Sequence, residues 1–177
     1  MNKITTIAIS ALTALATLAP GAMAKSNYPA HVSLGRTIRA TGVNLKFNPA
    51  ECDEKNAMGW YWAYKNEMVI CQENRRRGFG FQHEVRWTEE DLDTLRHEAQ
   101  HLIQDCMDGS RQGALSSVYR DVPTLVKSTL STQAIQSIMR SYSDKSDHII
   151  MMELEAFAVA ARNIPADQAI DIQKFCF

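Results

Sequence analysis

The chain has 177 residues, of which 45% are hydrophobic, a share that is normal for a globular domain and too high for a disordered chain. Its 19 basic and 20 acidic residues leave a formal net charge of −1, which argues against nucleic acid as the main partner.

The N-terminus has the features of a cleaved signal peptide. Lys3 precedes an apolar stretch from Ile4 to Leu18, and Ala22-Met23-Ala24 has the small-x-small form of a signal peptidase site. We therefore expect residues 1–24 to be removed and residues 25–177 to form one exported domain, periplasmic or extracellular, with no stable membrane insertion. A membrane anchor is the alternative, but the stretch is short and poor in Leu and Ile for a span.

Hydrophobic periodicity and turn signals predict a small N-terminal antiparallel sheet followed by helices. The first expected elements are a helix over 30–40, a strand over 43–47, and a hairpin with strands over 57–64 and 67–71. The later ones are helices over 88–107, 122–130, 131–141, 148–163 and 165–174. This order predicts an α+β fold with a mostly helical C-terminal part.

The chain has four cysteines, and an even number in an exported protein predicts two disulfides. Three pairings are possible. We favour Cys52–Cys71 and Cys106–Cys176, because each joins segments that we expect to meet. A cysteine metal site is disfavoured, because the sequence has no CxxC pair.

A run of five residues, His97-Glu98-Ala99-Gln100-His101, forms an HExxH motif on a predicted helix. Histidines four residues apart point the same way, so both imidazoles can reach one ion. Glu98 lies between them, where it can take a proton from a zinc-activated water. Two surface histidines on an ordinary amphipathic helix are the alternative.

The faces of this helix favour the metal interpretation. At 100° per residue, one apolar stripe collects Leu92, Leu95, Ala99, Leu102 and Cys106. The two histidines face away from this stripe, towards a cleft or a second lobe. Asp105 shares their face and is a candidate acceptor for an imidazole N–H, although a solvated Asp near a helix end is the competing interpretation.

A catalytic zinc usually has three protein ligands, so one more is needed. Gln104 and Met107 stand where one common extension of the motif has Gly and His, which excludes that class. On the helix over 148–163, Glu153 lies in the middle of an apolar stripe, whereas Glu155 falls on the expected polar side. A buried carboxylate needs a partner, and a zinc ion held by the two histidines would be one. A buried pair of Glu153 with Arg or His is the alternative.

The HExxH motif followed by Glu153-Leu154-Glu155-Ala156-Phe157-Ala158 resembles the gluzincin zinc metallopeptidases, which have a zincin-like fold. In several of those families the third ligand opens an E-x-x-A stretch on a helix, and Glu153 matches that ligand. The hairpin strand Met68–Cys71 resembles in placement the edge strand that holds substrate in zincins. An Asp that usually follows the alanine of this stretch is replaced by Phe157, so the subfamily stays open.

The resemblance implies an exported peptidase with one Zn²⁺ per chain, bound by His97, His101 and Glu153, with Glu98 as general base. The substrate, a protein or peptide, would add a strand alongside Met68–Cys71. A helper for the developing oxyanion is expected, and three side chains are candidates: His148, Tyr119 and Tyr142.

Two other functions share this site. One is a zinc-dependent amidase that acts on cell-wall material, and the other is a non-catalytic zinc-containing binding module. Glu98 favours an enzyme, because a purely structural zinc site needs no general base.

Overall fold

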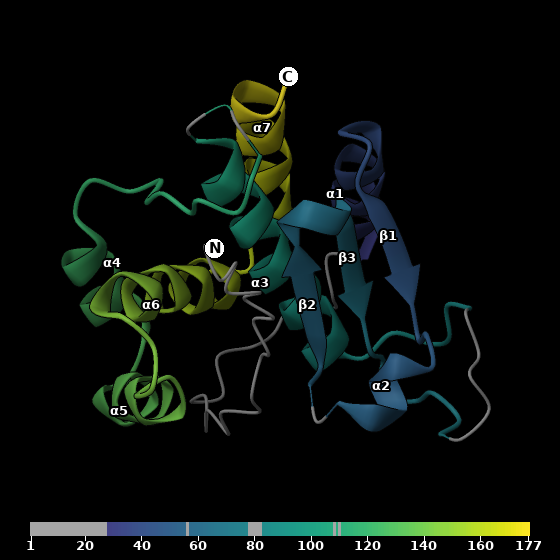
Figure 1. Ribbon diagram of the computed structural model, residues 1–177, viewed down its shortest axis with the longest axis horizontal. Coiled ribbons are helices and arrows are strands. Elements are labelled where there is room, and N and C mark those ends of the chain that lie inside the picture. The colour runs from purple at the N-terminus through teal and green to yellow at the C-terminus, as the bar shows by residue number, and fades with distance from the viewer. Residues whose placement is uncertain (1–27, 56, 78–82, 108, 110) are drawn as a thin grey trace, which may run out of the picture.

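The computed structural model describes residues 28–55, 57–77, 83–107, 109 and 111–177 (Figure 1). The expected signal peptide, residues 1–24, lies outside the described part of the chain. None of the described helices combines the length and the apolar character that crossing a bilayer requires.

Helices make up most of the fold. They are α1 (Tyr28–Ala40), α2 (Glu51–Glu54), α3 (Glu89–Cys106), α4 (Val122–Thr129), α5 (Thr132–Ser141), α6 (Asp147–Ala161) and α7 (Pro165–Phe175). The strands are β1 (Asn44–Phe47), β2 (Gly59–Trp62) and β3 (Glu67–Ile70), with a 3₁₀ turn (Ala63–Lys65) between β2 and β3. The predicted elements are confirmed with ends shifted by at most two residues, whereas α2 and the 3₁₀ turn were not predicted.

The sheet is mixed, which corrects the expected antiparallel one. Its strand order is β1-β3-β2; β2 and β3 form the predicted antiparallel hairpin, but β1 and β3 are parallel. The chain crosses from β1 through α2 and β2 before it enters β3, so that β1 and β3 run in the same direction. The strand β3 is therefore central and pairs on both sides, and the expectation that Met68–Cys71 is an edge strand was wrong.

Both disulfides form with the expected pairing. Cys52–Cys71 joins α2 to the end of β3, with its two Cα atoms 5.5 Å apart, and Cys106–Cys176 joins the ends of α3 and α7, with a Cα separation of 5.1 Å. Two disulfides indicate an oxidising, exported environment. Each closes a loop and so restricts the unfolded chain, an effect of about 3–4 kcal/mol for loops of this size.

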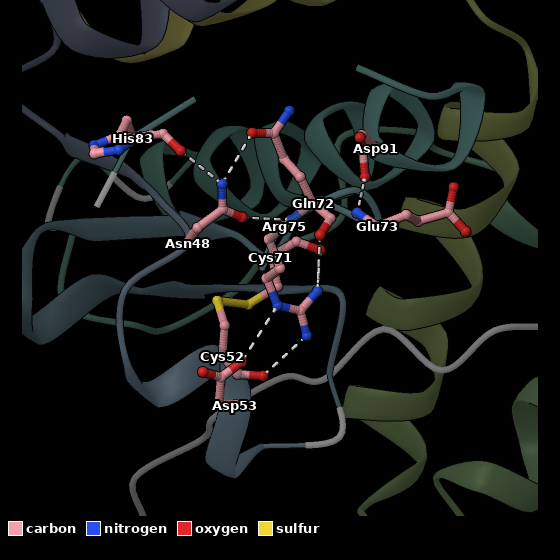
Figure 2. Close-up of a disulfide and its surroundings, with 9 residues drawn as sticks. All are labelled: Asn48, Cys52, Asp53, Cys71, Gln72, Glu73, Arg75, His83 and Asp91. Atoms are coloured by element: carbon pink, nitrogen blue, oxygen red, sulfur yellow. Dashed lines mark hydrogen bonds and ion pairs between the residues drawn. A yellow bond between two sulfur atoms is a disulfide. The ribbon is translucent and has the colours of Figure 1, made fainter. Parts of the chain in front are cut away.

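A polar cluster at the end of the sheet fixes where α3 begins (Figure 2). Asn48 follows β1. Its side-chain oxygen accepts a hydrogen bond from the Gln72 backbone amide at 2.8 Å, and its side-chain NH₂ group donates to the His83 carbonyl at 2.7 Å. The Glu73 amide donates to Asp91 in the first turn of α3 at 2.9 Å. The ends of two parallel strands thus hold the segment that leads into α3.

Arg75 adds further hydrogen bonds at the same end of the sheet. Its guanidinium donates to the carbonyls of Cys71 at 3.2 Å, Gln72 at 2.9 Å and Cys52 at 3.0 Å, as Figure 2 shows. The guanidinium therefore bridges the two sides of the Cys52–Cys71 disulfide.

Helix α3 runs through the middle of the molecule and is buried along most of its length (Figure 1). It begins with a capping box, in which the Thr88 hydroxyl accepts from the Asp91 backbone amide at 3.2 Å and the Asp91 carboxylate accepts from the Thr88 backbone amide at 2.9 Å. Its apolar stripe packs on α1, α7 and the sheet, in one core that contains Leu95, Ala99 and Leu102. Its opposite face packs against α6, which also closes a second core with α4 and α5.

Gly59 lets α3 and β2 approach closely. A Cβ atom at this position would lie 2.7 Å from both Thr94 Cγ2 and the Val69 carbonyl oxygen, and 3.4 Å from Cγ of Glu98. Any side chain here would therefore push β2 away from the helix that carries the HExxH motif.

We expect Gly59→Ala to lower the free energy of unfolding by about 1–3 kcal/mol, because the added methyl group overpacks the α3–β2 contact. Urea unfolding of the two proteins measures this. Gly35→Ala in α1 is the matched control: its Cβ would meet Leu45 at an ordinary 3.7 Å. Alanine favours a helix interior over glycine, so this control should be neutral or stabilising. Equal effects at both positions would contradict the packing argument.

Candidate metal centre

The two histidines of α3 converge on one point. Nε2 of His97 and Nε2 of His101 are 3.1 Å apart, and the two rings meet edge to face with their centroids 4.7 Å apart. Both side chains are almost fully buried, at 1% and 0% exposure. The histidine face of α3 thus lies against α6 and not in solvent, as the helical pattern predicted.

Glu153 on α6 completes the group. Its Oε2 lies 3.4 Å from His97 Nε2 and its Oε1 lies 3.6 Å from His101 Nε2, and the side chain is fully buried. One ligand atom from each of the three residues lies within 4.8 Å of the others. Besides the two imidazoles, the Tyr142 hydroxyl interacts with this carboxylate. Two imidazole nitrogens and a carboxylate in this arrangement can hold a metal ion.

The electrostatics of the group follow from burial and from the charges placed face to face. Burial alone would raise the pKa of Glu153, but His101 and then His97 lower it to about 2. Burial opposes the charge of His101, but the Glu153 carboxylate outweighs it and raises the pKa of His101 to about 9. Burial lowers the pKa of His97. Without a metal ion, the group is therefore an ion pair of Glu153 with His101, beside a neutral His97.

Glu98 lies on the side of this group that faces β2. Burial raises its pKa to about 8; the charge of His101 and the Tyr61 backbone amide oppose the rise, whereas Glu153 adds to it. The side chain is fully buried, and no side chain of the described residues donates a hydrogen bond to either oxygen. Its Cγ atom lies beside Gly59 at the start of β2. Glu98 is therefore a buried carboxyl between the three candidate ligands and a sheet strand.

Of the three candidate oxyanion helpers, Tyr142 reaches this group. Burial raises the pKa of its hydroxyl, and so do the charges of Glu153 and Glu98. The Tyr119 hydroxyl instead accepts a hydrogen bond from Arg162 at 3.3 Å. Nε2 of His148 pairs with the Leu115 carbonyl at 2.8 Å. The sequence alone left these three side chains undistinguished, because their positions depend on how α5 and the 111–121 segment fold over α6.

Glu155 is buried, which corrects its expected exposure. The side chain is 0% exposed and accepts from Gln100 at 2.9 Å, Gln104 at 3.1 Å and Ser117 at 2.5 Å. The sequence contained the signal for this burial. The side of α6 around Glu155 carries Met151, Met152, Ala158 and Val159, so the helix is apolar nearly all round and had to be buried.

Asp105 is not the acceptor for an imidazole N–H; Gln104 takes this role. Asp105 accepts from the Tyr61 hydroxyl at 2.8 Å and from the Gly113 amide at 2.6 Å, so it ties α3 to β2 and to the following loop. Nδ1 of His101 pairs instead with Oε1 of Gln104, at 2.8 Å. Gln104 lies three residues after His101 on the same helical face, a spacing that could have revealed it.

The fold and the site together define a disulfide-bonded α+β protein with a buried His-His-Glu group that can hold a metal ion. Residues 18–177 match the family described as "Domain of unknown function (DUF8637)", and the chain belongs to this family. No curated protein and no solved structure matched the chain.

We expect a chelator-treated sample to bind one divalent ion per chain and to gain thermal stability on binding. An ion at 1,000 times its Kd adds about 4 kcal/mol, which for a chain of this size raises the melting temperature on the order of 10 °C. Glu153→Gln should abolish this rise, and His83→Ala, at an exposed histidine, should preserve it. Differential scanning calorimetry with and without Zn²⁺ makes the comparison. An undiminished rise in Glu153→Gln would refute the ligand assignment.

Proposed function

We propose that the protein is an exported zinc-dependent peptidase of the gluzincin type, with a zincin-like arrangement of β2, α3 and α6. The observation that carries this proposal is the Glu98 carboxyl. It is buried beside His101 and Glu153, and only the charge of His101 and the Tyr61 backbone amide favour its ionised form among the described residues. Burying a carboxyl in such a place costs several kcal/mol, and a purely structural metal site does not need this group.

Zinc suits the candidate ligands. A tetrahedral zinc ion with donor distances of about 2.0–2.1 Å separates neighbouring donors by about 3.3–3.4 Å. The two imidazole nitrogens lie 3.1 Å apart, and each lies near a different oxygen of Glu153: His97 is 3.4 Å from Oε2 and His101 is 3.6 Å from Oε1. The three ligand atoms lie within 4.8 Å of one another, so a rotation of the carboxylate would bring one oxygen into the set.

A bound zinc ion would polarise the scissile carbonyl and make a water molecule more acidic. In the proposed reaction, Glu98 takes the proton of that water and passes it to the leaving amine. The Tyr142 hydroxyl donates a hydrogen bond to the oxygen on which negative charge develops. His97, His101 and Glu153 hold the ion, and their burial between α3 and α6 fixes their positions.

The substrate strand is proposed to add to β2, and not to β3 as the sequence suggested. The Cys71 amide donates to the Met58 carbonyl, so the alternation of an antiparallel pair directs the backbone groups of Gly59 and Tyr61 away from β3. No described strand pairs with this edge of β2. The Tyr61 amide on the same edge acts on the Glu98 carboxyl. A peptide added there would pass alongside the general base.

One observation favours a second candidate, a non-catalytic zinc-containing module. His97, Glu98, His101 and Glu153 are all 1% exposed or less, and a closed site suits a structural ion better than a turnover site. The two candidates make different predictions for a Glu98 variant: the peptidase loses cleavage activity, whereas the non-catalytic module has none to lose.

Glu98→Gln should lower peptide cleavage by about 10³-fold or more while one zinc per chain is retained, because the amide accepts no proton. Mass spectrometry of a mixed peptide library measures cleavage, and elemental analysis counts the metal. Glu89→Gln, at an exposed position of the same helix, is the control and should behave like the wild type. If no peptide or protein is cleaved by the zinc-loaded wild type, the peptidase proposal is wrong.

Tyr142→Phe should lower turnover by about 10²-fold with zinc content and KM nearly unchanged, because the hydroxyl acts only when charge develops on the substrate oxygen. Tyr119→Phe is the matched control and should alter turnover by less than about threefold, because its hydroxyl bonds Arg162. Steady-state kinetics on the best library peptide provide the measurement. A larger loss in Tyr119→Phe than in Tyr142→Phe would reverse the assignment.

A further inference from the structure

A buried polar network connects His101 to a second carboxylate of α6. Glu155 accepts from side chains of α3 and from the segment after it: Gln100, Gln104, Ser117 and the Val118 amide. No lysine or arginine of the described chain forms an ion pair with it within 4.0 Å. Neutral donors therefore satisfy this buried carboxyl group, and it can orient the side chains that donate to it.

Glu155 fixes which way the Gln104 amide points. Nε2 of Gln104 lies 3.1 Å from Oε1 of Glu155 and 3.0 Å from the Met152 carbonyl oxygen. A carboxylate and a backbone carbonyl only accept hydrogen bonds, so the NH₂ group must face α6. The oxygen of the amide must then face His101.

This orientation in turn fixes the proton on His101. The Gln104 oxygen lies 2.8 Å from Nδ1 of His101 and can only accept, so Nδ1 carries the hydrogen. A metal ligand must be a neutral imidazole. When the His101 ring is neutral, Nε2 therefore has its lone pair directed towards His97 and Glu153, as a metal ligand requires. The other amide orientation would place the amide oxygen against two acceptors, the Glu155 carboxylate and the Met152 carbonyl.

We propose that Glu155 is a positioning residue that acts through Gln104 to hold His101 in the tautomer that binds the metal ion. The proposal rests on the metal-binding role of His101 in the proposed function. It assigns to Glu155 the support of a ligand, and not ligation itself, which belongs to Glu153.

Gln100 and Gln104 provide a matched pair for the test. Both lie on the same face of α3 and donate to the same Glu155 oxygen, but only Gln104 reaches His101. Gln104→Leu should weaken zinc binding 10- to 100-fold, the usual effect of removing a hydrogen-bond partner of a ligand, and Gln100→Leu should change it less than about threefold. Competition for Zn²⁺ with a chromophoric chelator measures both. Equal losses would mean that the network only stabilises the fold, and would overturn the proposal.

Exchanging the two partners tests the part played by Glu155. Gln104→Glu keeps an acceptor for His101 but faces it with a second carboxylate, so zinc affinity should fall at least 10-fold. Adding Glu155→Gln removes the second carboxylate and restores a donor between the two positions, so the affinity should rise at least about fivefold above that of Gln104→Glu. It should stay below the wild type, because the Met152 carbonyl still faces an acceptor. If Gln104→Glu binds zinc as the wild type does, or if the second change brings no recovery, Glu155 does not act through Gln104.

A spectroscopic measurement distinguishes positioning from folding. In the protein loaded with Co²⁺, the Nδ1 hydrogen of His101 should give a shifted NMR signal that exchanges slowly with D₂O. The signal should persist in Gln100→Leu and disappear in Gln104→Leu, which removes the acceptor for the Nδ1 hydrogen. These measurements need no cleavage assay, so a protein that binds metal with these responses but cleaves nothing would refute the peptidase and leave the positioning role intact. Retention of the signal in Gln104→Leu would refute the positioning role alone.

Discussion

The contact on which the site depends is the meeting of one buried carboxylate with two buried imidazoles, between α3 and α6. Glu153 lies 3.4 and 3.6 Å from the histidine nitrogens, in surroundings from which water is largely excluded. Charges in such surroundings interact strongly, so Glu153 and His101 stay ionised in the absence of metal. The same closeness makes the group ready to bind a cation, because the carboxylate and the imidazoles already point at one another.

The rest of the fold holds α3 and α6 in this relation. The apolar stripe of α3 is fixed by α1, α7 and the sheet, while a disulfide joins its last residue, Cys106, to Cys176 after α7. Arg96, beside the first ligand, donates to the Ala160 carbonyl near the end of α6 at 2.8 Å, and so binds the two helices together. After the parallel pair β1–β3, Gln72 binds Asn48 and the Val85 amide, and the Glu73 amide donates to Asp91 in the first turn of α3. A helix held at both ends has little freedom to separate its histidines from Glu153.

The sequence predicted the elements and the three candidate ligands because these depend on local spacing. The period of α3 separates its histidines from its apolar stripe, and the apolar surroundings of Glu153 indicate its burial. Predictions that depended on long-range packing were less successful. Whether β3 is an edge or a central strand depends on where β1 docks, and no local pattern specifies this. The burial of Glu155 was missed because α6 was assigned a solvent face, whereas α3 and the 117–119 segment cover that side with hydrogen-bond donors.

The two histidines are supported in different ways, and this difference explains the polar network of α6. The ring of Phe157 packs on His97 at a centroid distance of 4.4 Å, and Nδ1 of His97 has no hydrogen bond among the described residues. Packing restricts where that ring lies, but it does not select a tautomer. His101 has Gln104 at Nδ1, and Gln104 is oriented by Glu155. His101, with its tautomer fixed, and the Glu153 carboxylate would together define where an ion binds. His97 could then adopt the tautomer that completes the site. A helix with a single Glu among apolar residues could supply a ligand but could not orient its partner, which gives a physical reason for two carboxylates on α6.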